Sequence, residues 1–169
     1  MNFNLNGEEF KSQSRVIFNN GKAGKVENVK ISVEKRKADE MESLPDYKVF
    51  FTDENDAQIN LGIYYPNEQT TESQTKITVS KALAVARSVV GEDYIFPEVT
   101  SVKEAIDVCM KIVNQNTDKR VNVFATFGTT GYPKKYLGVY KNYDFIEAFG
   151  TNPSKLRATM NPNKPQYND

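Results

Sequence analysis

The sequence predicts a mainly β domain of the α+β class, built from five short strands and two helices. Three observations support this fold class: apolar and polar residues alternate along several short segments, apolar residues recur at helical spacing in two central segments, and turn-forming Asn, Asp and Gly separate the segments. The chain has 169 residues, enough for one domain with additional arms. We therefore expect an N-terminal arm at residues 1–20, one domain at 21–149 and a flexible C-terminal tail at 150–169.

Three strands are expected in the first half of the chain. Val29, Ile31 and Val33 alternate with polar residues, as in a strand with one buried face. A second strand is expected at 47–52 and a third at 59–65, where a proline follows. An acidic turn between the second and third strands predicts that they form a hairpin.

Two helices are expected after this hairpin. Residues 78–90 place apolar side chains on one helical face, and Gly91 ends that segment. Ser101 and Glu104 form an S-x-x-E capping pattern before a second helix that runs to about residue 115.

The remaining strands flank a glycine-rich loop. A fourth strand is expected at 121–127 and a fifth at 136–141, followed by a short segment at 144–149. The loop at 128–133 lacks the glycine spacing of a P-loop and precedes a strand, so we interpret it as a hairpin tip. An OB-fold-like five-stranded barrel accommodates this order with one or two inserted helices, although one helix before the fourth strand is usual.

Several kinds of chemistry are excluded by composition. The chain has no histidine, no tryptophan and a single cysteine, Cys109, which removes His-based catalysis and His or Cys zinc sites. Cys109 lies on the apolar face of the second predicted helix, where we expect a buried thiol. The acidic turn at 53–58 does not match an EF-hand loop. We therefore expect no enzyme activity, cofactor, catalytic residue or metal site.

The same features predict a cellular location. A lone cysteine cannot form an internal disulfide, and the N-terminus lacks the basic and apolar run of a signal peptide. No apolar run approaches the roughly 20 residues that a membrane-spanning helix needs. We expect a cytoplasmic protein that does not contact a membrane.

Charge is distributed unevenly along a chain whose net charge is zero. Residues 119–141 contain five basic residues and no acid, whereas residues 39–56 contain seven acids and one lysine. This polarity is compatible with a phosphate-attracting surface. The alternative is that both stretches are solvated loops.

Aromatic and basic residues are expected together on the face of the sheet opposite the core. Alternation sends rings and lysines to that face, where bases could stack at roughly 1–3 kcal/mol each while cations contact phosphates. The alternative is that a helix or the N-terminal arm covers these rings as a second small core. The candidate nucleic-acid-binding residues are Lys48, Phe50, Tyr64, Arg120, Phe124, Tyr132, Lys134, Lys135, Tyr136, Tyr140 and Lys141.

Three segments resemble the single-stranded DNA-binding proteins with an OB-fold that bacteriophages encode. They are GKAGKVENVK at 21–30, PDYKVFFTD at 45–53 and VFATFGTTGYPKKYLGVY at 123–140. The resemblance implies sequence-tolerant coating of single-stranded DNA during replication and recombination, in the host cytoplasm. The resemblance also allows two kinds of protein partner: replication or recombination proteins, and further copies of the chain. The family's acidic tail is not matched, because the tail here carries Lys155, Arg157 and Lys164 against one acid.

Two other functions remain open at this point. A viral structural or assembly protein could use the aromatic face and the N-terminal arm for subunit contacts. A metal-dependent nuclease is a third hypothesis, which divalent-metal-dependent cleavage of nucleic acid would support.

Overall fold

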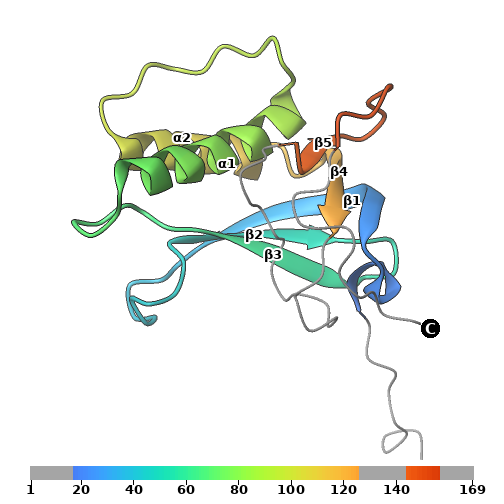
Figure 1. Cartoon of the computed structure of the whole chain (residues 1–169), viewed down its shortest axis with the longest axis horizontal. Coiled ribbons are helices and arrows are strands. Elements are labelled where there is room, and N and C mark those ends of the chain that lie inside the picture. Colours follow the sequence, from blue (N-terminus) through green and yellow to red (C-terminus); the bar gives the residue numbers. More distant parts are fainter. Residues whose placement is uncertain (1–16, 126–143, 157–169) are drawn as a thin grey trace, which may run out of the picture.

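The computed structural model describes residues 17–125 and 144–156. Within them, five strands form one antiparallel sheet in the order β3-β2-β1-β4-β5 (Figure 1). A 3₁₀ helix, η2, precedes the sheet, and two α-helices connect β3 to β4. The elements are η2 (Phe18–Gly21), β1 (Gly24–Lys35), β2 (Tyr47–Thr52), β3 (Gln58–Ile63), α1 (Glu72–Val90), α2 (Val102–Asn114), β4 (Arg120–Ala125) and β5 (Ile146–Ala148).

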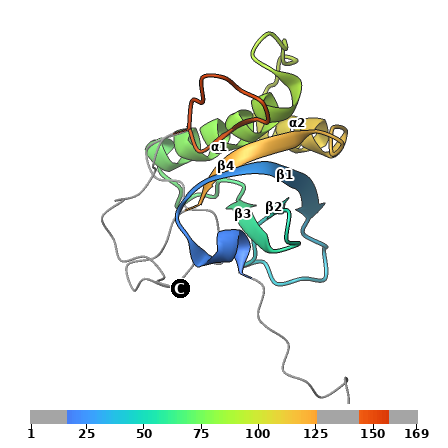
Figure 2. The same ribbon diagram turned by 90° about the vertical axis from the view of Figure 1, so that its right-hand side faces the viewer.

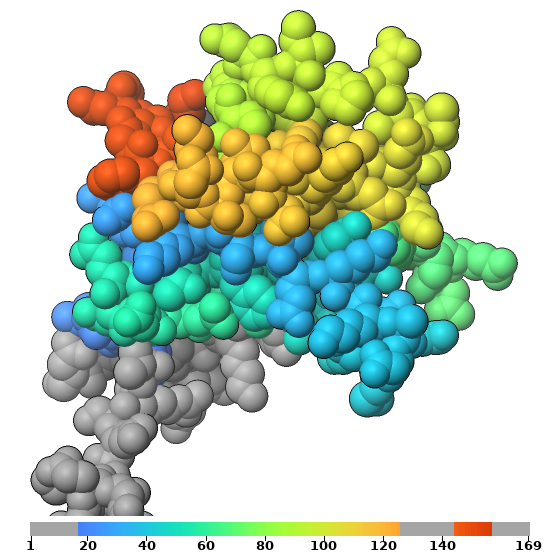
Figure 3. Space-filling model, turned by 180° about the vertical axis from the view of Figure 1, so that it is seen from behind, coloured from blue at the N-terminus to red at the C-terminus, as the bar shows by residue number. Residues whose placement is uncertain are grey.

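Both α-helices lie on one face of the sheet. They pack side by side, α2 against β1 and α1 against β3, β4 and β5 (Figures 1 and 2). In the space-filling view the helical layer lies directly on the strands (Figure 3). The strand residues that point toward the helices are buried and apolar, which makes their removal from water the main favourable contribution to folding. They include Val29, Ile31, Val49, Phe51, Ile59, Leu61, Val121 and Val123.

β1 is long enough to pair with β2 along one part and with β4 along another. Its pairing with β4 contains a bulge, because the register shifts between Val26 and Val29. Within this bulge Asn28 adopts a positive φ of 57°, a conformation that Asn tolerates better than most residues.

The helix ends show which capping patterns the chain uses. α1 begins six residues before the predicted start, at a capping box in which Thr71 and Gln74 each accept the other's backbone N–H. Gly91 ends α1 with a φ of 88°, as predicted. Ser101 caps α2 by accepting the Glu104 N–H, also as predicted, but the Glu104 carboxylate instead accepts hydrogen bonds from Thr100.

Parts of the expected arm and tail pack on the domain. Phe18 is buried in the core, and the turn that follows it has positive φ at Asn19, Asn20 and Gly21. Beyond β5, the Ser154 hydroxyl and the Lys155 N–H both donate to the Glu147 carboxylate. These contacts extend the packed structure into both regions that we had assigned to arms.

The α+β class and the five-stranded antiparallel sheet are confirmed, but a closed barrel is not. β3 and β5 are the sheet's two edges in the described residues, and they lie at opposite ends of the strand order. The OB-fold is therefore not confirmed. The sheet's fifth strand is Ile146–Ala148, within the short segment predicted at 144–149, and the strand predicted at 136–141 lies outside the described residues.

Neither helix in the described part of the chain combines the length and the apolar character needed to cross a membrane. Cys109 is buried in the core, as expected.

Candidate nucleic-acid interface

The sheet face that points away from the helices is called the outer face here. Its members alternate with the buried core residues along each strand, and the strand pairings place them in rows across the sheet. The outer face contains Lys25, Lys30, Ser32 and Glu34 of β1, Lys48, Phe50 and Thr52 of β2, Gln58, Asn60 and Gly62 of β3, Arg120, Asn122 and Phe124 of β4, and Glu147 of β5.

Five of the eleven candidate residues lie on or beside this face. Lys48, Phe50, Arg120 and Phe124 belong to it, and the Tyr64 ring lies 3.5 Å from the position that a Cβ on Gly62 would take. The other six lie outside the described residues: Tyr132, Lys134, Lys135, Tyr136, Tyr140 and Lys141.

The outer-face rings are separate from the buried core. Phe50 and Phe124 are half-buried, and neither packs against the core cluster of the described residues. Tyr64 is 50% exposed. Phe50 lies between Ser32 and Asn60 in its row, so small or polar side chains flank it.

An unpartnered hydrogen-bond acceptor lies in the same row. The Oδ1 atom of Asn60 is buried and has no donor among the described residues. A buried acceptor without a donor costs free energy. Asn60 lies directly opposite Phe50 in this row.

Two cations lie directly opposite each other in the middle of the outer face. Lys30 of β1 pairs with Arg120 of β4, and uncharged Thr52 occupies the other side of Lys30 in the same row. Neither cation forms an ion pair with any residue of the described ranges. Like charges directly opposite each other on a sheet are unfavourable, so an anion placed between them would relieve their repulsion.

The other two cations of the face have acids nearby. Lys25 Nζ lies 2.9 Å from the Glu27 carboxylate and 3.8 Å from that of Glu147, and the hydrogen bond that the Lys25 ammonium donates to Glu27 is the main reason why the pKa of Lys25 is raised. Lys48 lies opposite Glu34 in its row. Available positive charge is therefore concentrated at the Lys30–Arg120 pair.

A buried polar network supports the β4–β5 side of the face. Glu147 accepts hydrogen bonds from Asn122 Nδ2 at 3.1 Å, Ser154 Oγ at 2.7 Å and the Lys155 N–H at 2.7 Å. Burial raises the pKa of the Glu147 carboxyl, but these donors and the charge of Lys25 lower it by more, so the group is held ionised. Asn122 also accepts the backbone N–H of Asn28, which joins the network to the bulge in β1.

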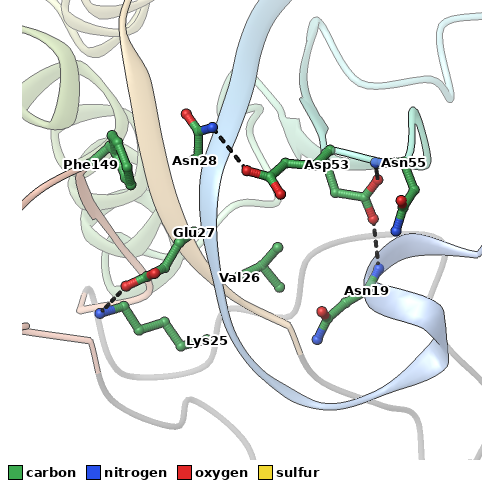
Figure 4. A pocket seen from close by; sticks show the side chains of 9 residues that line it. Asn19, Lys25, Val26, Glu27, Asn28, Asp53, Asn55 and Phe149 are labelled. Atoms are coloured by element: carbon green, nitrogen blue, oxygen red, sulfur yellow. Dashed lines mark hydrogen bonds and ion pairs between the residues drawn. The ribbon is translucent and has the colours of Figure 1, made fainter.

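A cavity of about 400 Å³ lies at the end of the sheet beside this bulge (Figure 4). Its lining contains three acids, Glu27, Asp53 and Glu54, and the single cation Lys25. Asp53 accepts backbone N–H groups from Asn19, Asn55 and Ala57 and so holds the β2–β3 turn. Acidic lining would repel phosphate, so the cavity does not extend the candidate interface.

The sequence interpretation did not include one polar cluster on the helical side. Asp107 of α2 accepts hydrogen bonds from the hydroxyls of Tyr47 and Tyr65, which come from β2 and the segment after β3. Lys35 and Lys103 lie over the Tyr47 and Tyr65 rings. The cluster ties α2 to the β2–β3 hairpin. In the sequence, Asp107 is one of two acids in the predicted helix and lies beside its apolar face.

The fold and the outer face define an α+β protein with an open antiparallel sheet, two helices on one face and a basic, partly aromatic surface on the other. Comparison with family models, curated proteins and solved structures finds no match for the chain.

Proposed function

We propose that this protein binds single-stranded DNA on its outer face, with little sequence preference, and protects it during replication or recombination. The observation that carries the proposal is the Lys30–Arg120 pair, two adjacent cations without a described counter-ion between outer-face rings. Phosphate supplies the missing negative charge, and bases supply flat surfaces for Phe50, Tyr64 and Phe124.

Spacing on the outer face favours an extended single strand. Phe50 pairs with Ser32 and Phe124 pairs with Lys25, so the two rings are separated by most of the length of β1. At about 3.3 Å per residue along a strand, this separation is roughly 20 Å. A path of that length spans several nucleotides, and the Lys30–Arg120 pair lies within it.

Single-stranded rather than duplex DNA is favoured because only unpaired bases can leave their stack and meet isolated rings. Duplex binding would use the cations alone and would leave Phe50 without a role. The OB-fold assignment remains part of the proposal, since partly open five-stranded barrels of that fold bind oligonucleotides on a strand face. The phage origin and the cytoplasmic location also remain part of the proposal.

The first experiment is a titration of a fluorescent poly-dT oligonucleotide at low and moderate salt, with a matching duplex as control. We expect tighter binding to the single strand, with an affinity that falls steeply as salt rises. Absence of binding at low salt, or equal affinity for the duplex, would contradict the proposal.

The residue assignment is tested by the double variant Lys30→Gln/Arg120→Gln. Each lost phosphate contact should reduce the slope of log affinity against log salt by about 0.7, so this variant should show a slope shallower by about 1.4. The matched control is Lys76→Gln/Lys111→Gln, which removes the same charge from the helical layer and should keep the original slope. An equal change in both variants would show that only net charge matters.

A further inference from the structure

The loop between α1 and α2 presents an exposed apolar tip. Ile95 is 90% exposed, and Tyr94 and Val99 are 39% and 38% exposed. Single exposed apolar residues are common on protein surfaces, but three within six positions of one loop form a patch.

This tip is held in place by contacts at both ends of the loop. The Arg87 guanidinium lies over the Phe96 ring at 4.9 Å and donates to the backbone carbonyl of Glu92. Tyr94 packs edge-on against Phe96, with ring centroids 5.0 Å apart. At the far end, the backbone N–H and hydroxyl of Thr100 both donate to Glu104 of α2. An apolar tip on a braced loop loses little conformational freedom when it docks.

Charge around the tip is acidic. Residues 91–99 contain Glu92, Asp93 and Glu98 and no basic residue, and their one ion pair in the described ranges is an exposed contact of 4.0 Å between Glu92 and Lys155. The outer face has the complementary character, with half-buried rings and the Lys30–Arg120 pair.

The tip and the outer face lie on opposite sides of the molecule. In Figures 1 and 2 the α1–α2 loop extends beyond the helices, whereas the outer face is the side of the sheet that the helices leave uncovered. One chain therefore cannot bring its own tip to its own outer face. A contact between these two surfaces in different copies is head-to-tail, and it leaves one tip and one face free for further copies.

We propose that the α1–α2 loop of one copy docks on the outer face of a second copy, with Ile95 against the rings and the acids beside Lys30 and Arg120. The occupant is a second copy because the chain carries both complementary surfaces. The docked loop and DNA would compete for the same outer face, but the association requires no DNA, so its test is independent of the function proposed above.

The test measures the mass of the full chain in solution by light scattering over a range of concentrations. At low salt, the average mass should rise continuously with concentration above that of one chain, and added salt should reverse the rise. Ile95→Ser should weaken association about tenfold or more, as expected for loss of one buried aliphatic side chain. Met41→Ser is the matched control, since Met41 is 71% exposed in the loop between β1 and β2.

Complementation distinguishes this contact from any symmetric dimer. Ile95→Ser keeps a normal outer face, and Lys30→Gln/Arg120→Gln keeps a normal loop, so each variant alone should remain a single chain at concentrations where the wild type associates. An equal mixture should form one-to-one dimers that do not grow. A wild-type chain that remains single at every concentration, a mixture without dimers, or an Ile95→Ser chain that associates like the wild type would each overturn the proposal.

Discussion

The carboxylate of Glu147 provides a quantitative test of the described fold. It is buried, and three donors from Asn122, Ser154 and Lys155 converge on it. Hydrogen bonds to a charged group contribute about 1.5–3 kcal/mol each. Glu147→Gln keeps the shape of the side chain but removes its charge. It also replaces one carboxylate oxygen by an NH₂ group, which would face a hydrogen-bond donor of the protein. We expect unfolding free energy to fall by roughly 2–4 kcal/mol. The melting temperature should fall by about 6–12 °C.

The effect should depend on pH in a defined direction. The pKa of Glu147 in the folded protein is below its ordinary value of 4.5, so the ionised group stabilises the fold fully above about pH 4.5. This contribution is lost as pH falls through the lowered pKa. Urea unfolding followed by circular dichroism should therefore show a large difference between wild type and variant at pH 7 and a smaller one near pH 3.

The matched control for this experiment is Glu27→Gln. Glu27 contacts the same lysine, Lys25, but its side chain is 58% exposed. An exposed ion pair contributes little, so the urea midpoint should remain unchanged. If Glu147→Gln unfolded at the wild-type midpoint, or if its deficit were the same at both pH values, the assignment of Glu147 as a buried ionised acceptor would be wrong.

Two further predictions concern the helical side of the sheet. Burial and then the hydrogen bond to Asp107 raise the pKa of Tyr47 to about 12. Asp107→Ala should lower this pKa toward 10, and an absorbance titration of tyrosinate should show the shift. An unchanged titration would show that Asp107 does not hold the Tyr47 hydroxyl. Cys109 should resist a thiol reagent at pH 8 in the folded protein and react in urea, since burial raises the pKa of its thiol to about 11; rapid reaction of the folded protein would show that the thiol is accessible.

Local patterns in the sequence predicted most of the strands and the second helix. Alternation located β2 at its observed bounds, and Ser101 located the start of α2. The start of α1 was missed because Thr71 and Gln74 form a capping box before a polar first turn. That turn has no apolar residues at helical spacing, which is the pattern used to predict the helix.

Long-range pairings could not be predicted in the same way. The outer-face positions of Lys48, Phe50 and Phe124 follow from the two-residue period of a strand. Lys30 was not a candidate, because its importance comes from the pairing of β1 with β4, and Arg120 is far from it in the sequence. The Asp107 cluster likewise joins segments that only the folded chain brings together.

The bulge in β1 determines which charges share a surface. Lys25 and Lys30 are five positions apart, an odd number, so a regular strand would direct them to opposite sides of the sheet. The additional residue at the bulge makes their spacing effectively even, and both side chains project to the outer face. Removing Asn28 would leave Lys25 and Lys30 four positions apart, so a regular strand would keep both lysines on the outer face and Val26 toward the helices. The bulge thus lets β1 carry one additional residue while the lysines on both sides of it still project to the same surface.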